Sequence, residues 1–249
     1  MRAVLAAIAL VTSVSASAAG QPPSRCADCH YASPRAPMIS HVEAWNHSVH
    51  GRAEVGCESC HGGDASTFDQ FLAHRDILSP AVLSSPVHPL NLPATCGSCH
   101  AGPYVAFQES WHFQMQRAGD ARGPTCSTCH GEVIGYRLSP KEFGKQCAAC
   151  HGPNAMAPRP DRPENARLLL EQIRDARVEL ARARASIRKI GEKTRRAALE
   201  ERARLAEVPL VEATRNIHRF VFVEAQDRLD AARYRIGMLA EMLTPVTAP

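Results

Sequence analysis

Every cysteine of the chain lies in one short pattern that occurs five times. The pattern is Cys-x-x-Cys-His, and its five copies use all ten cysteines. In this spacing, two thiols can add to the two vinyl groups of one haem, and the histidine that follows lies under the ring as an iron ligand. The residues are Cys26, Cys29 and His30; Cys57, Cys60 and His61; Cys96, Cys99 and His100; Cys126, Cys129 and His130; Cys147, Cys150 and His151.

Other uses of cysteine fit this pattern less well. One isolated copy would also suit half of a zinc site or a thioredoxin-type redox pair. A disulfide framework would not require a histidine after every second cysteine. Five copies, each followed by histidine, therefore predict five covalently bound c-type haems with iron as the metal.

The N-terminus suggests export. Arg2 is followed by an apolar run to Val11, and Ala16-Ser-Ala18 is a small-x-small cleavage pattern. This is typical of a secretory signal peptide over residues 1–19. The alternative, an uncleaved anchor, is disfavoured because the run is too short to span a bilayer. We expect a periplasmic protein with no transmembrane segment in the mature chain.

The overall charge does not point to a class of partner. The formal net charge is +4, and Arg2 is the only charged residue within 1–19, so cleavage lowers the charge to +3. The propionates of five haems would outweigh this excess. We draw no inference about nucleic acid or membrane from the charge, and we expect no nucleic-acid partner.

Composition divides the chain near Pro158–Pro163. All cysteines and eleven of the twelve histidines come before this point, and a tail rich in Arg, Glu, Ala and Leu follows it. The expected fold class is mainly α. We expect a pentahaem domain over residues 20–157, with little regular strand, and a long antiparallel helical hairpin over residues 164–243.

The tail carries two heptad seams, which predict two long helices. Pro209 is placed at the start of the second helix, because proline is tolerated in a first turn. Such a tail is able to pair with itself or with another chain. The seams are Leu169, Ile173, Ala176, Leu180, Ala183, Ile187 and Ile190, then Phe222, Ala225, Leu229, Ala232, Ile236, Leu239 and Leu243.

The haem domain contains an internal repeat. Trp45-x-x-Ser48-x-His50 precedes the second motif, and Phe107-x-x-Ser110-x-His112 precedes the fourth. Each stretch also follows a Cys-x-x-Cys-His. This indicates duplication of a two-haem module.

Seven histidines remain to supply the second axial position of each iron: His41, His47, His50, His74, His88, His112 and His218. His50 and His112 hold equivalent repeat positions, so we expect a shared role as distal ligands. His218 lies four residues before Phe222 on the seam, so it faces inward. The competing interpretation of His218 is a histidine buried against the partner helix. We favour a ligand that reaches from the tail into the haem domain.

Several stretches resemble the multihaem cytochrome c superfamily, which includes hydroxylamine oxidoreductase, the tetrahaem cytochromes that accept its electrons, and pentahaem nitrite reductase. The similarity covers residues 26 to about 155, and the tail resembles the C-terminal helices of these enzymes more loosely. The stretches are Trp45-x-x-Ser48-x-His50 through Cys57-Glu-Ser-Cys60-His61-Gly-Gly-Asp, Ala73-His74-Arg-Asp-Ile-Leu, Thr95-Cys96-Gly-Ser-Cys99-His100, Ser110-x-His112 and Cys126-Ser-Thr-Cys129-His130-Gly131.

The resemblance implies distal-ligand roles for His50, His112 and His74, the last shortly after a Cys-x-x-Cys-His-Gly. The fifth distal ligand stays open between His41, His47, His88 and none. His47 lies too close to His50 to serve the same haem, and His88 sits between Val87 and Pro89 in a restricted loop. We favour His41. Which distal histidine serves which haem is not decided by the sequence.

The leading functional hypothesis is electron transfer between a donor and a terminal acceptor or reductase, with redox proteins as partners. The alternative is an enzyme of the nitrite or hydroxylamine type with one open haem, which rests on family analogy. The sequence departs from nitrite reductase, since it has no Cys-x-x-Cys-Lys. A third option is a haem-stabilised scaffold whose Arg-rich tail docks a partner. The expectation is therefore an electron carrier, and no catalytic residue is assigned.

Overall fold

The computed structural model describes residues 24–33, 39–131, 139–155 and 157–244. Within these ranges all regular structure is helical, which confirms the mainly α class. The expected signal peptide, residues 1–19, lies outside the described residues. None of the described helices has the length and apolar character needed to cross a bilayer.

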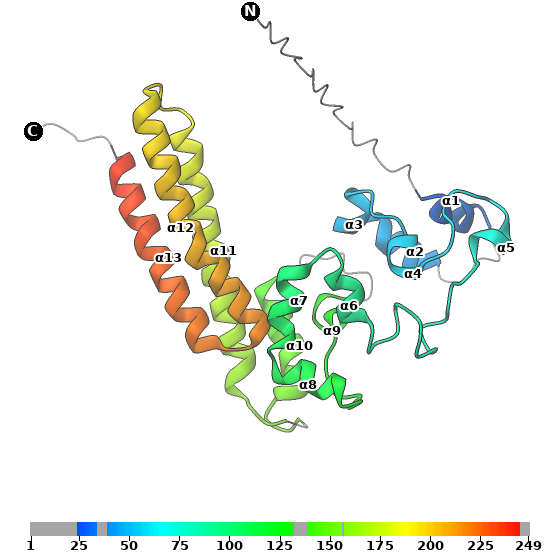
Figure 1. Ribbon diagram of the computed structural model, residues 1–249. Coiled ribbons are helices and arrows are strands. Elements are labelled where there is room, and N and C mark those ends of the chain that lie inside the picture. Colours follow the sequence, from blue (N-terminus) through cyan, green and yellow to red (C-terminus); the bar gives the residue numbers. More distant parts are fainter. Residues whose placement is uncertain (1–23, 34–38, 132–138, 156, 245–249) are drawn as a thin grey trace, which may run out of the picture.

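Among the described residues, ten short helices come first, and none exceeds twelve residues. They form two groups: α1–α5 at one end of the molecule and α6–α10 next to the long helices (Figure 1). Their bounds are α1 Arg25–Ala32, α2 Ile39–Asn46, α3 Val49–Arg52, α4 Glu58–His61, α5 Gln70–Ala73, α6 Leu92–Gly97, α7 Ala101–Gln108, α8 Trp111–Arg117, α9 Cys126–His130 and α10 Pro140–His151.

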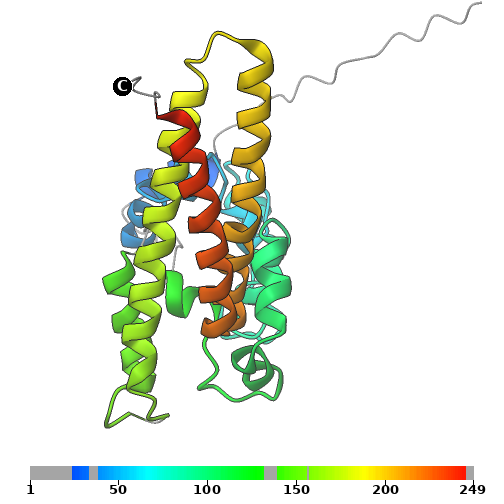
Figure 2. The ribbon, with the colours of Figure 1, turned by 90° about the vertical axis from the view of Figure 1, so that its left-hand side faces the viewer.

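Three long helices follow: α11 (Asp161–Ile187), α12 (Lys193–Arg219) and α13 (Phe222–Leu243). They run side by side, each antiparallel to the one before it, as Figures 1 and 2 show together. The bundle meets the rest of the chain where α10 packs on α11 and α7 packs on α12.

The predicted seams form the core of this bundle. The side chains from Leu169 to Ile187 on the first seam are buried, and so are those from Ala225 to Leu239 on the second. Ile190, Phe222 and Leu243, at the seam ends, are partly buried against the same core. Both seams therefore pack within one chain, each against the other two helices.

The predicted two-helix hairpin is wrong, because a third helix, α12, lies between the two seams. Its buried face carries three alanines, Pro209 and Asn216, and its only large aliphatic residues are Leu199 and Leu210. Alanine is only weakly hydrophobic, so the buried positions of this helix differ little in hydrophobicity from their neighbours in the sequence. A three-helix bundle buries all three faces at once.

The predicted position of Pro209 at a helix start is also wrong, since Pro209 is buried in the interior of α12. Proline has no N–H, so the carbonyl of Leu205, four residues earlier, loses its helical partner. The Arg235 guanidinium of α13 donates to this carbonyl at 2.7 Å. A neighbouring helix thus satisfies the acceptor that the proline leaves free.

Candidate functional site: five facing histidine pairs

Each of the five motif histidines faces one histidine from outside the motifs. The ring centroids are 6.0 Å apart in four pairs and 6.4 Å apart in the fifth. The pairs are His30 with His74, His61 with His41, His100 with His50, His151 with His112, and His130 with His218. The second members are the five histidines expected from the sequence to be distal ligands.

The separation fits one iron between two imidazoles. A bond from an imidazole nitrogen to a metal is about 2 Å long, and the ring centre lies about 1 Å beyond the nitrogen. Two imidazoles on opposite sides of one metal therefore have centroids about 6 Å apart. The distance alone does not distinguish this arrangement from ring packing, since aromatic pairs also pack with centroids about 4.5–7 Å apart, but here nearly the same distance recurs at all five motif histidines. The histidine pairs thus fit the group that the cysteine pattern implies.

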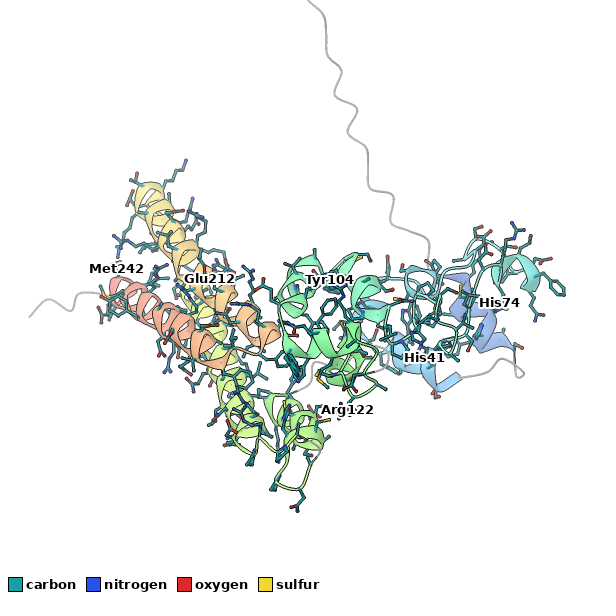
Figure 3. All side chains as sticks on the ribbon, turned by 60° about the horizontal axis from the view of Figure 1, so that its bottom comes forward. His41, His74, Tyr104, Arg122, Glu212 and Met242 are labelled. Atoms are coloured by element: carbon teal, nitrogen blue, oxygen red, sulfur yellow. The ribbon has the colours of Figure 1, made fainter. Side chains whose placement is uncertain are left out.

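Figure 3 shows where one member of each of two pairs lies. His41 and His74 lie at the end opposite to Glu212 and Met242 of the bundle, and Tyr104 lies between them. The pair of His130 and His218 is next to the bundle, because His218 belongs to the last turn of α12.

The repeated Ser-x-His stretch is a helix start that carries one of the paired histidines. Ser48 is the N-cap of α3 and accepts a hydrogen bond from the Gly51 N–H at 2.9 Å. Ser110 is the N-cap of α8 and accepts from the Phe113 N–H at 3.1 Å. Both serines are buried. The histidine two residues later is thereby held in the first turn of a capped helix.

Three of the ten histidines have an Nδ1 atom that donates to a backbone carbonyl. His74 donates to Gln70 at 2.8 Å, His151 to Ala157 at 3.0 Å, and His218 to Thr214 at 3.0 Å. A carbonyl only accepts, so the proton sits on Nδ1 in each bond. This leaves the Nε2 lone pair free for a metal and fixes the ring orientation.

Burial keeps several of these imidazoles neutral, which is the form that binds metal. Burial lowers the pKa of His61, and His41 adds to the effect. Burial also lowers the pKa of His130 and of His218. The largest shift is at His112, where burial and then His151 lower the pKa to about 4.

The cysteines of consecutive motifs lie beside one another in space. Burial raises the pKa of the Cys57 thiol to about 11, with Cys26 of the first motif as the next cause. Burial raises the pKa of Cys60, and Cys96 and Cys99 of the third motif add to it.

The cysteines of the third, fourth and fifth motifs also lie beside those of the next motif. A hydrogen bond with Cys126 of the fourth motif is the main cause that raises the pKa of Cys96. Burial raises the pKa of Cys129 to about 11, with further contributions from Cys147 and Cys150 of the fifth motif. The five motifs thus follow one another in space in the order of the chain. All ten cysteines are free, so the disulfide alternative finds no support here.

The pairing resolves which histidine faces which motif. His41 comes before the second motif in sequence and faces it, whereas His50 passes over that motif and faces the third. His112 likewise passes over the fourth motif and faces the fifth. His47 and His88 face no motif histidine. Nδ1 of His88 instead accepts from the Leu90 N–H at 3.2 Å.

The repeat explains why the bundle supplies His218. When Trp45 is aligned with Phe107 and His50 with His112, the counterpart of His41 is Pro103, which cannot bind a metal. His41 faces the second motif, and the fourth motif, its equivalent, instead faces His218 of α12. His218 of α12 therefore faces the motif for which the second repeat has no histidine of its own.

The end of α12 is attached to the region that carries the Cys-x-x-Cys-His motifs by an ion-pair cluster. The Glu109 carboxylate at the end of α7 contacts the Arg215 guanidinium at 2.9 Å and the Arg219 guanidinium at 2.7 Å. These groups are partly exposed, so the cluster orients more than it stabilises. On the other side of the pair, Phe143 of α10 packs edge-on against His130 at 5.3 Å.

The region before α11 has little core made of side chains. Among its described residues, the buried aliphatic and aromatic side chains are Ala27, Val42, Pro93, Ala106 and Phe107. Many large apolar side chains in the same region are exposed, which is costly in water unless other apolar material covers them. They are Tyr31, Phe68, Phe71, Leu72, Val82, Leu83, Leu90, Val105 and Trp111.

Among the described residues, no three side chains of His, Cys, Asp or Glu come together in a cluster suited to a bare metal ion. The histidines occur in pairs instead. Comparison with known proteins finds no matching family model, no matching curated protein and no matching solved structure. The similarity to the multihaem cytochromes thus remains one of motifs.

Proposed function

We propose that this protein is a periplasmic c-type cytochrome that holds five haems and passes electrons from a donor protein to a terminal acceptor or reductase. The observation that supports it best is that all five motif histidines face a second histidine at about the spacing of two axial ligands. The localisation rests on the expected signal peptide.

The cysteines and the histidines would have different roles, haem attachment and iron ligation. The two cysteines of each motif would attach one haem, and the facing histidines would hold its iron from both sides. Haem iron held in this way cycles between its ferric and ferrous states and so carries one electron. The Nδ1 bonds of His74, His151 and His218 hold their rings in the ligating orientation.

The histidine pairs favour transport over catalysis. Turnover of nitrite or hydroxylamine needs an iron with an open position, and such a site would leave one motif histidine without a partner. Every motif histidine has one. The two remaining histidines, His47 and His88, face no motif histidine.

Electron paramagnetic resonance of the oxidised protein tests this proposal. The haem content is first measured by the pyridine haemochrome assay, with five per chain expected. All iron should then give low-spin signals. A stoichiometric high-spin signal, or turnover of nitrite, hydroxylamine or sulfite by fully loaded protein, would favour the enzyme instead.

A further inference from the structure

The turn between α12 and α13 has an unusual residue at its left-handed position. Phe220 has φ 60°, a backbone region in which glycine or asparagine is normally found. The turn is closed by bonds from the Phe220 N–H to the Ile217 carbonyl and from the Val221 N–H to the Asn216 carbonyl. The backbone alone would favour glycine here, so the ring is a candidate for another role.

The Phe220 ring packs directly on a proposed ligand. Its centroid lies 4.2 Å from that of His112, and the two planes meet at 84°. Phe107 packs against Phe220 at 6.4 Å and against Phe113 at 5.6 Å, which extends the aromatic wall. The wall leaves His112 little freedom to rotate.

His112 also differs from His74, His151 and His218 at its second nitrogen. Its Nδ1 is buried and has no hydrogen-bond partner. In His74, His151 and His218 the same atom donates to a carbonyl. Such a bond makes the imidazole a more basic ligand and so favours ferric iron.

We propose that Phe220 is a positioning residue for His112, which fixes the plane of its imidazole and keeps water from Nδ1. The inference rests on the proposed function, because His112 is taken as the ligand opposite His151. Phe220 is then a residue that sets the reduction potential of this haem. A dry and unassisted ligand favours ferrous iron, so Phe220 raises the reduction potential of the haem on His112 and His151.

The test replaces the ring without disturbing the turn. Phe220→Gly suits φ 60° and removes the ring, so the bundle should stay folded. Phe220→Leu keeps apolar bulk but lacks the flat face, and Phe220→Tyr keeps the ring. Val223→Ala is the matched control, because Val223 lies in the next turn and is 78% exposed. The signal of the haem concerned is identified as the one lost in His112→Ala.

Potentiometric titration followed by electron paramagnetic resonance gives the readout. In Phe220→Gly and Phe220→Leu this one low-spin signal should shift and its midpoint potential should fall, with the other four haems unchanged. Phe220→Tyr and Val223→Ala should match the wild type. Unchanged signal and potential in either ring-deleted variant would overturn the inference. Fewer than five low-spin haems in the wild type would instead count against the proposed function.

Discussion

At the scale of single residues, the facing pairs give each proposed ligand a specific partner. His218 is the most informative, since it lies far along the chain from the motif that it faces. Its Nδ1 bond to Thr214 and the stacked arrangement with His130, with an interplanar angle of 13°, both suit a second axial ligand. The competing interpretation, a histidine buried against a partner helix, does not account for this alignment.

Removal of one distal ligand should change one haem. We expect His218→Ala to convert one of the five low-spin haems to high spin, because an axial position is opened. Visible and electron paramagnetic resonance spectra of the oxidised protein measure this. His88→Ala is the matched control and should leave all five haems low-spin, since His88 faces no motif histidine. The same spectrum for both variants would contradict the pairing.

At the scale of elements, the caps and the proline explain how short and long helices hold ligands. Ser48 and Ser110 start the helices that carry His50 and His112, so a local signal positions these ligands. Pro209 has the opposite effect, because it opens the hydrogen-bond ladder of the helix that carries His218. The contact from Arg235 links α12 to α13 at this point.

The bond from Arg235 to Leu205 should depend on Pro209. We expect Arg235→Met to destabilise the bundle by about 1 kcal/mol, the usual net value of one hydrogen bond. In the Pro209→Ala background the loss should be smaller, because the new N–H supplies the Leu205 carbonyl with a helical partner. A double-mutant cycle by thermal or urea unfolding measures the coupling.

Arg228→Met serves as the control for this cycle. Arg228 also lies on α13, but it makes only an exposed ion pair with Glu212 at 3.6 Å. Its effect should be small and independent of residue 209. Additive effects of Arg235→Met and Pro209→Ala would show that the bond does not replace the missing helical partner.

At the scale of the whole molecule, two kinds of core meet. The bundle has a continuous core of Leu, Ile and Ala, whereas the motif-bearing region buries few apolar side chains. The first can fold by burial of its own surface. The second depends on bound haem for its apolar interior under our proposal.

This difference predicts how the chain behaves without haem. Protein produced without haem attachment should keep α11–α13 folded and lose structure over residues 24–131. Hydrogen exchange should show protected amides in the bundle and rapid exchange elsewhere, with broad protection restored in the haem-loaded protein. Equal protection of both regions in the haem-free chain would contradict a haem-dependent core.

Much of the candidate site followed from local sequence, because its chemistry is local. A Cys-x-x-Cys-His holds its three residues within one helical turn or beside it, and Ser-x-His is a cap followed by a side chain in the first turn. The buried seams were also predictable, since Leu and Ile at heptad spacing need cover from water. The third helix was not, because Ala203, Ala206 and Ala213 give little contrast and Pro209 is typical of a helix start.

Only the tertiary structure decided which histidines meet. His47 is nearer than His41 to the second motif in sequence, yet only His41 faces it. His50 and His112 each pass over the next motif along the chain, and His218 reaches the fourth from the far end of α12. Sequence spacing across loops between short helices does not predict which distant residues meet. These pairings therefore depend on how the helices pack. The sequence determined the five motifs and the histidines available to pair with them. Packing between helices determined which histidine faces each motif.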